Sequence, residues 1–157
     1  MTKILFVCHG NVCRSPMAEY VFKKIIKDNG KENDYVIASA AATDEEIING
    51  VGNPVYPPAK ATLIRHGIRC DGKRAVQLTA EDYDKYDLII VMDSENVRDF
   101  FSLFGSDPGQ KMHKLLDYCG GGDVADPWFT NDFEKAYDDV CRGCAALFEE
   151  LEKKNDL

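Results

Sequence analysis

The chain has 157 residues, 45% of them hydrophobic, and a formal net charge of -8, which fits one domain over residues 1–157 with a single core. The acidic charge disfavours nucleic acid and anionic membranes as partners, and no apolar run approaches the roughly 20 residues that span a bilayer. The first apolar run, residues 4–8, is too short for a signal peptide, so we expect a cytoplasmic protein whose six cysteines do not form a disulfide framework.

The first half of the chain alternates between strand and helix patterns. β-Branched and aromatic residues with little alternation predict a buried strand over residues 3–8. Ser15 as N-cap and Pro16 in the first turn then predict a helix that ends near Gly30. This half is completed by a second strand at 35–39, a long loop at 40–58 and a helix at 58–66 closed by Gly67.

The second half continues the alternation. It predicts a short helix opened by Thr79, a strand at 87–92 and a helix capped by Ser94. A weaker strand at 112–118 and a Gly-rich loop at 119–131 follow. The last helix is capped by Asn131, with Glu134 as its capping-box partner. Strands that alternate with helices are typical of a doubly wound α/β fold. We therefore expect a four-stranded parallel sheet with helices on both faces and a ligand site at the carboxyl ends of the strands.

The segment between the first strand and the first helix predicts an anion site. Gly10 and Asn11 tolerate left-handed backbone angles, and successive N–H groups of such a turn can converge on an anion. The helix N-terminus faces the same point, and Arg14 adds a planar fork of donors that suits phosphate. The phosphate-binding residues are then expected to be His9, Gly10, Asn11, Val12, Cys13, Arg14 and Ser15.

Cys8 ends the predicted strand directly beneath this loop. A cysteine at a helix N-terminus and beside an arginine is expected to be a thiolate at neutral pH. Such a thiolate is poised to attack phosphorus in line, while the loop amides stabilise the transition state.

The stretch from Cys8 to Arg14-Ser15-Pro16, close to the N-terminus, resembles the signature of the low-molecular-weight protein-tyrosine phosphatases, and the resemblance spans nearly the whole chain. It implies an enzyme that hydrolyses phosphotyrosine in proteins, and small aryl phosphates, through a phosphocysteine. It implies phosphotyrosine proteins as partners, no cofactor and no metal. We also expect a monomer.

Asp126-Pro127 lies in the Gly-rich loop, where Pro127 restricts Asp126 to an extended backbone. The resemblance implies that Asp126 is the general acid, a role worth ~10²–10⁴ in rate. It also implies that Trp128 and Phe129 form a wall against the tyrosine ring. By itself, the pattern around Asp126 favours a residue that merely caps a turn, and the catalytic role is expected only together with the cysteine loop. The family commonly has two tyrosines after Asp-Pro, and this chain departs from that pattern.

The resemblance also implies supporting roles. Ser15 would donate a hydrogen bond to the thiolate, and Asn11, Ser39 and His66 would form a network that braces the loop. For His66 a helix-terminal position that interacts with the dipole remains an alternative. Cys13 would form a reversible disulfide with the nucleophile.

A histidine and an acidic segment are expected near the phosphate-binding loop. His9 occupies a position that is usually apolar in the family, where it either contacts substrate or faces solvent. Residues 44–46, Asp-Glu-Glu, lie where many relatives carry an aromatic residue at the pocket rim. We hypothesise that acidic residues there disfavour acidic phosphopeptides.

Three other functions compete with this one. Arsenate reductase needs two further cysteines on a mobile segment, and Cys70 has no such neighbour. In phosphoarginine phosphatases a threonine takes the place of Val12, and an apolar residue suits an aromatic ring better. A catalytically silent phosphate-binding module would not need all three proposed catalytic residues.

Cys141 and Cys144 have the spacing of a metal half-site, but they fall on an apolar helix face and favour core packing.

Overall fold

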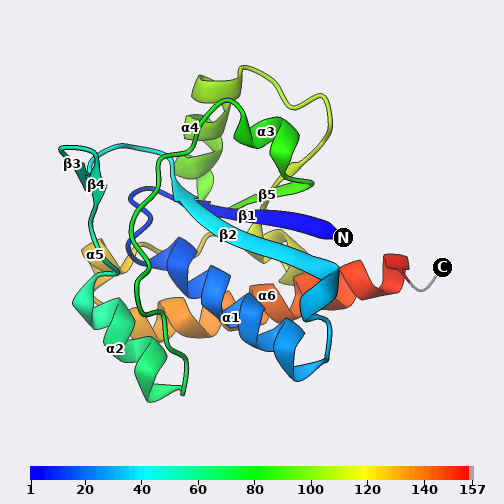
Figure 1. Ribbon diagram of the computed structural model, residues 1–157, viewed down its shortest axis with the longest axis horizontal. Coiled ribbons are helices and arrows are strands. Elements are labelled where there is room, and N and C mark those ends of the chain that lie inside the picture. Colours follow the sequence, from blue (N-terminus) through cyan, green and yellow to red (C-terminus); the bar gives the residue numbers. More distant parts are fainter. Residues whose placement is uncertain (156–157) are drawn as a thin grey trace.

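The computed structural model describes residues 1–155 and contains a four-stranded parallel sheet with the order β2-β1-β5-β6. Its strands are β1 (Thr2–Cys8), β2 (Tyr35–Ala41), β5 (Leu88–Val91) and β6 (Met112–Lys114). β1 lies in the middle, paired along its whole length with β2 and over residues 4–7 with β5 (Figure 1). The predicted doubly wound parallel sheet is confirmed.

Helices cover both faces of this sheet. Figure 1 shows α1 (Arg14–Asp28), α2 (Pro57–Arg65) and α6 (Phe133–Asn155) on one side, and α3 (Asp82–Lys85) and α4 (Ser94–Phe104) on the other. Side chains of β1 alternate between two hydrophobic clusters: Phe6 lies in the cluster under α1 and α6, and Val7 lies in the cluster under α4. Both faces of β1 are therefore buried, which explains its continuous apolar sequence.

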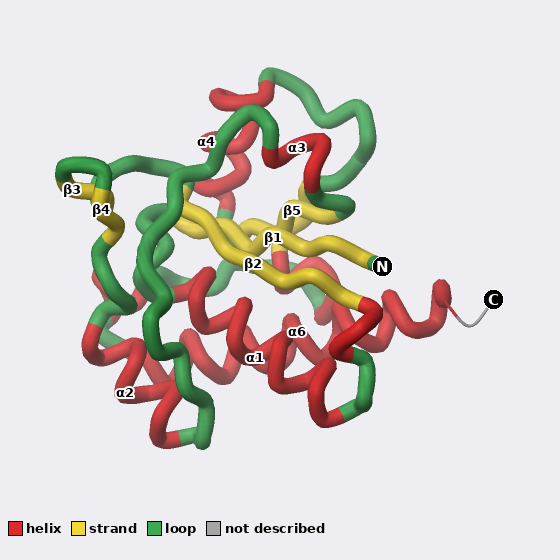
Figure 2. The backbone as a smooth tube through the Cα atoms, viewed as in Figure 1, coloured by secondary structure: helices red, strands yellow, loops and turns green. Residues whose placement is uncertain are grey.

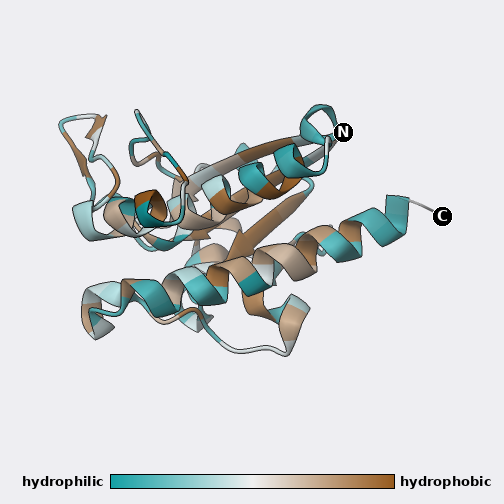
Figure 3. Cartoon of the chain, turned by 90° about the horizontal axis from the view of Figure 1, so that it is seen from below, coloured by the Kyte–Doolittle hydropathy of each residue, from teal (hydrophilic) through white to brown (hydrophobic). Residues whose placement is uncertain are grey.

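The hydropathy colouring agrees with this layering. In Figure 3 the strands appear as brown segments between the helices, whereas the last turns of α6 are hydrophilic. None of the helices within residues 1–155 is both long enough and apolar enough to cross a bilayer.

The predicted N-caps are displaced by one or two residues. α1 begins at Arg14, with Cys13 in the N-cap position and no side-chain cap. Asp93 rather than Ser94 caps α4, and Asp132 rather than Asn131 accepts a hydrogen bond from the backbone of α6. Since Ser, Asn and Asp are all good N-caps, a run of them does not reveal which one the chain uses.

The loops hold more regular structure than predicted. The strand expected at 112–118 ends at Lys114 and continues as a 3-10 helix, η2 (Leu115–Cys119), because Leu115 and Leu116 are buried in the core. The long loop after β2 contains the antiparallel hairpin β3 (Ile47–Ile48) and β4 (Val51–Gly52). The Gly-rich loop contains α5 (Pro127–Thr130), and a 3-10 turn, η1 (Glu32–Asp34), precedes β2 (Figure 2).

Candidate active site

The proposed nucleophile lies at the carboxyl edge of the central strand. Cys8 is the last residue of β1, is 3% exposed, and lies at the floor of a cavity of about 620 Å³. The cavity wall combines residues of the loop after β1 with residues of the Gly-rich loop, of α4 and of the long loop after β2. The topology therefore brings four separate segments to one edge of the sheet, as expected for this fold class.

The loop after β1 has one residue with a left-handed backbone. Asn11 has a φ of 58°, as predicted, but Gly10 does not adopt a positive φ. Space is tight at position 10 instead, since a Cβ atom there would lie 3.0 Å from Cγ of Glu46 and the Glu46 side chain would have to shift.

A buried hydrogen-bond network starts at the cysteine sulfur. The Ser15 hydroxyl lies 3.0 Å from Cys8 Sγ. The Asn11 amide donates to the Ser15 and Ser39 hydroxyls at 2.8 Å and 2.9 Å, and its oxygen accepts from the Val76 N–H at 3.0 Å. The amide of Asn11, which is 1% exposed, thus bonds through both its nitrogen and its oxygen, which holds the Ser15 hydroxyl in place.

Two charged residues that sequence reasoning missed close this network. The Ser39 hydroxyl donates to Glu19, and the Lys73 ammonium donates to the Ser39 carbonyl at 3.2 Å and lies 3.7 Å from the Glu19 carboxylate. Burial lowers the pKa of Lys73, a shift that Glu19 only partly offsets. The sequence could have indicated Glu19, because it is an acidic residue one helical turn after Ser15 on the buried side of α1.

His66 lies outside this network, contrary to the prediction. Its imidazole is 2.9 Å from Glu134 and stacks on Tyr137 with ring centroids 4.0 Å apart. It occupies the C-cap position of α2, and α2 packs against α6, so the side chain faces that helix. Its position at the end of α2 agrees with the alternative expectation, a histidine at a helix terminus.

Arg14 is buried beside the cysteine, with only 2% of its surface exposed. One guanidinium nitrogen pairs with Asp93 and donates to the Val124 carbonyl at 2.9 Å, and the other lies 3.4 Å from Asp126. Burial alone would lower the pKa of Arg14, but the charge of Cys8 and those of the two carboxylates outweigh it and raise the pKa. Sequence reasoning missed Asp93, although an acidic residue directly after a buried strand at the sheet edge was a usable signal.

Asp126 both caps a helix and faces the cavity. One carboxylate oxygen accepts from the Trp128 N–H at 3.0 Å, and the other points to Arg14. The backbone of Asp126 is extended, as Pro127 requires. Asp126 therefore caps α5, as the capping interpretation expects, and also contacts the Arg14 guanidinium at the cavity.

Aromatic side chains line the cavity above Cys8. Trp128 and Phe129 are 67% and 83% exposed at its rim. Tyr56 and Phe133, which were not predicted, also line the cavity, and the Tyr56 ring stands edge-on to Trp128 and stacks on Phe133. Together they form an aromatic, apolar wall on one side of the cavity.

Comparison with known proteins agrees with this geometry. The family model described as low molecular weight phosphotyrosine protein phosphatase matches residues 3–157. The chain belongs to this family.

Individual relatives support the assignment over the full length. The chain is 36% identical to a low molecular weight protein-tyrosine-phosphatase of Bacillus subtilis, YfkJ, with 100% of both chains covered. It is also 36% identical to the low molecular weight phosphotyrosine protein phosphatase of Sus scrofa, over 94% of each chain. The crystal structure of YfkJ superimposes with a TM-score of 0.91 over 98% of this chain and 96% of that one. A Drosophila arginine phosphatase is less similar, at 26% identity and a TM-score of 0.83 over 96% of this chain and 98% of that one.

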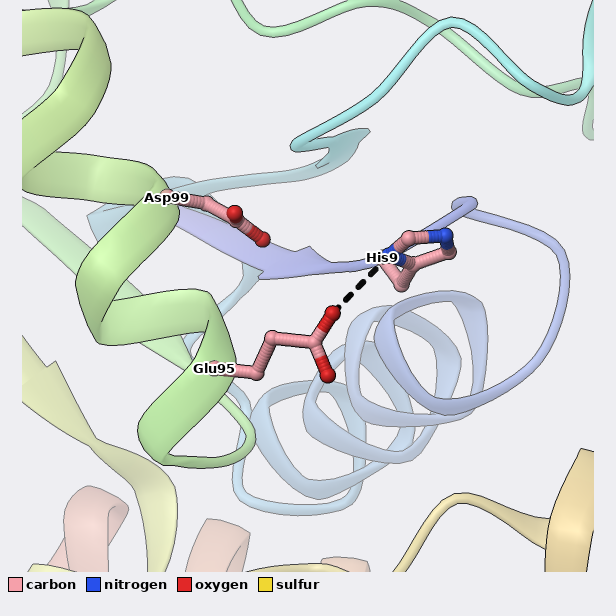
Figure 4. Close-up of side chains that lie close together, drawn as sticks. All are labelled: His9, Glu95 and Asp99. Carbon is pink, nitrogen blue, oxygen red and sulfur yellow. Dashed lines mark ion pairs between the residues drawn. The ribbon is translucent and has the colours of Figure 1, made fainter.

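In this member of the low-molecular-weight phosphatases, His9 is held by acidic residues at the cavity rim. Its Nε2 atom lies 2.7 Å from Glu45, and its Nδ1 atom lies 3.8 Å from Glu95. Figure 4 shows His9 next to Glu95 and Asp99 of α4. Burial alone would lower the pKa of His9, but the hydrogen bond to Glu45 and the surrounding carboxylates raise it.

The same side chains are also potential metal ligands. Donor atoms of His9, Glu95 and Asp99 lie within 4.8 Å of one another. Since the His9 ring is already hydrogen-bonded to Glu45, we interpret the group as an ion-pair cluster.

The other cysteines of the phosphatase are free thiols. Burial and the charge of Cys8 raise the pKa of Cys13. Cys144 is fully buried, and its thiol donates to the Ala18 carbonyl at 3.7 Å, which is a core-packing environment.

Proposed function

We propose that the protein hydrolyses phosphotyrosine in proteins, and small aryl phosphates, in two steps through a phosphocysteine at Cys8. The observation that carries this proposal is the convergence of Cys8, Arg14 and Asp126 on one cavity. A nucleophile, a phosphate-binding cation and a proton donor are the three groups that this reaction needs.

In the first step the Cys8 sulfur attacks phosphorus. The S–P bond forms, the bond from phosphorus to the tyrosine oxygen breaks, and Asp126 gives its proton to that oxygen. Arg14 and the amides of the loop bind the phosphoryl oxygens. The Ser15 hydroxyl, 3.0 Å from the sulfur, donates a hydrogen bond to the thiolate.

In the second step a water molecule attacks the phosphocysteine. Asp126, now a base, takes a proton from that water, the S–P bond breaks, and inorganic phosphate leaves. The remaining residues proposed to bind substrate are His9, Gly10, Asn11, Val12, Cys13, Trp128 and Phe129, with Ser39 as a support of the loop.

Phosphoarginine is the second candidate substrate, since solved relatives include an arginine phosphatase. Val12 and the aromatic wall favour phosphotyrosine, because a planar apolar ring gains more from this surface than a guanidinium does. Arsenate reduction is less well supported, because Cys70 is buried and would need further cysteines nearby.

The setting of the enzyme is also proposed. We place it in the cytoplasm, as a monomer built from one domain over residues 1–157. The family match over residues 3–157 fits one domain.

Aryl phosphate hydrolysis in the presence of a chelator tests the proposal. Cys8→Ser should abolish turnover. Asp126→Ala should reduce kcat by ~10²–10⁴ for poor leaving groups and less for good ones. Turnover by Cys8→Ser near the wild-type rate would overturn the mechanism, and faster hydrolysis of phosphoarginine than of phosphotyrosine peptides would overturn the substrate.

A further inference from the structure

The cavity is strongly acidic for a site that takes a phosphate ester. Two arginines, Arg14 and Arg98, are the fixed cations among its lining residues. The lining also includes six carboxylates: Glu45, Glu46, Asp93, Glu95, Asp123 and Asp126. The deep part must attract phosphate, so the excess negative charge has to be located before its effect can be judged.

Four of the six carboxylates pair with polar groups other than His9. Asp93 and Asp126 pair with Arg14. Of the others, Glu46 accepts from the Asn53 amide at 2.7 Å, and Asp123 lies 2.9 Å from the Lys114 ammonium.

The unbalanced charge lies at the rim, around His9. Glu45 and Glu95 both line the cavity, are more than half exposed, and share the single His9 ring between them. Asp99 lies behind them on α4, and its Oδ2 atom is buried without a hydrogen-bond partner. Burial and the charge of Glu95 raise the pKa of Asp99, as expected where carboxylates outnumber cations.

We define Glu45 and Glu95, which both line the cavity, as the acidic rim; Asp99 lies behind it and adds a third negative charge. Arg98 offsets part of its charge, but within residues 1–155 no ion pair joins Arg98 to a carboxylate. Even a protonated His9 together with Arg98 carries two positive charges against three negative ones. The net charge of the whole chain, -8, adds to the negative potential around the rim.

We propose that the acidic rim binds a lysine or arginine side chain close in sequence to the phosphotyrosine, so that the enzyme prefers phosphotyrosine in basic segments. This inference rests on the proposed function and names its substrate class. When the phosphate is seated at Cys8, neighbouring residues of the substrate come close to the rim, because Glu45 and Glu95 line the same cavity as Cys8. A cation there meets exposed carboxylates, and a glutamate meets like charge.

The rim differs from the one that the sequence suggested. Of residues 44–46, Asp44 does not line the cavity and Glu46 bonds to Asn53. Glu95, from α4, is instead the second exposed carboxylate beside His9. The charge that selects the substrate is thus assembled from two distant segments.

Three phosphotyrosine peptides test the proposal, with identical lengths and with flanking lysines, alanines or glutamates. In a chelator at low salt, kcat/KM should be roughly tenfold higher for the lysine peptide than for the glutamate peptide, since several exposed pairs each contribute a few-fold at most. The ratio should fall towards unity in about 1 M salt, where the Debye length is ~3 Å.

The double variant Glu45→Gln/Glu95→Gln should lose most of this selectivity ratio. The matched control, Glu32→Gln/Glu81→Gln, removes the same charge at two exposed positions that do not line the cavity, and should keep the ratio. Equal rates for the three peptides, preference for the glutamate peptide, or the same loss of selectivity in the control would overturn the inference. If no phosphotyrosine peptide is hydrolysed at all, the proposed function itself fails.

Discussion

Asp93 holds Arg14 with one carboxylate oxygen and caps α4 with the other. Its Oδ2 atom accepts from the Arg14 guanidinium, and its Oδ1 atom accepts from the Asn96 N–H at 2.8 Å. The position of the buried guanidinium is thereby tied to the start of a helix on the opposite face of the sheet. Two substitutions can separate these functions.

Asp93→Asn and Asp93→Ala should both lower kcat/KM for aryl phosphates by about tenfold or more, because a misplaced catalytic group can cost ~10²-fold. Asparagine is a good N-cap and alanine is not, so Asp93→Ala should be less stable than Asp93→Asn by about 1 kcal/mol. Steady-state kinetics and urea denaturation measure the two effects. Wild-type activity in Asp93→Asn would show that Arg14 needs no charged partner.

Asn11 combines a left-handed backbone with three buried hydrogen bonds. Asn11→Gly and Asn11→Ala both remove these bonds, so both should lower kcat to a similar extent. Alanine pays a steric cost of ~1–2 kcal/mol in this conformation, whereas glycine does not. Urea denaturation should therefore show that Asn11→Ala is less stable than Asn11→Gly by about 1 kcal/mol. Equal stabilities of the two variants would contradict backbone strain at position 11.

The pKa of His9 should be above the ordinary value of about 6.5, since Glu45, Glu95 and Asp99 stabilise its charged form. The corresponding stability is fully present below the unfolded pKa and is lost as the pH rises through the higher folded value. An NMR titration of the His9 ring measures the shift. Glu45→Gln should lower the pKa, and a value unaffected by this substitution would refute the assigned cause.

Gly143 lies in α6 against the buried Leu115. A Cβ atom at position 143 would be 2.4 Å from Leu115 Cγ. Gly→Ala in an exposed helix stabilises by about 1 kcal/mol, but Gly143→Ala should destabilise by ~1–3 kcal/mol through overpacking. Thermal unfolding shows whether Gly143→Ala stabilises or destabilises the protein.

The matched background for that substitution is Leu115→Ala, which removes the clashing atoms. There, Gly143→Ala should be neutral or stabilising relative to Leu115→Ala alone. A stabilising effect in both backgrounds would mean that α6 moves freely away from η2.

The chemistry of the site was predictable where the residues are contiguous. Cys8 through Ser15 run from the end of β1 to the first turn of α1, so their proximity follows from the local fold alone. The role of Asp126 came from the family resemblance, because its local sequence with Pro127 alone favours a turn cap. The parallel order of the strands followed from their continuous apolar character.

Residues whose role depends on distant contacts were not predictable. Asp93 reaches Arg14 across 79 positions, and Lys73 meets Glu19 only because the chain returns beside α1. His66 was misplaced because the packing of α2 on α6, not the local sequence, sets the direction of its ring. The 3-10 turn at Leu115 was not predicted for a similar reason. A pair of apolar residues is equally typical of the end of a strand and of a buried turn.

The location of Cys8 on the central strand links the lifetime of the reactive thiol to that of the whole fold. Cys8 pairs with Ala41 on one side, and the same strand is bonded to β5 on the other. Strands in the middle of a sheet open only with global unfolding, whereas hairpins and helix ends fray locally. Fraying of the β3–β4 hairpin or of the end of α6 therefore leaves the nucleophile seated, and irreversible inactivation by heat follows the rate at which the entire molecule opens.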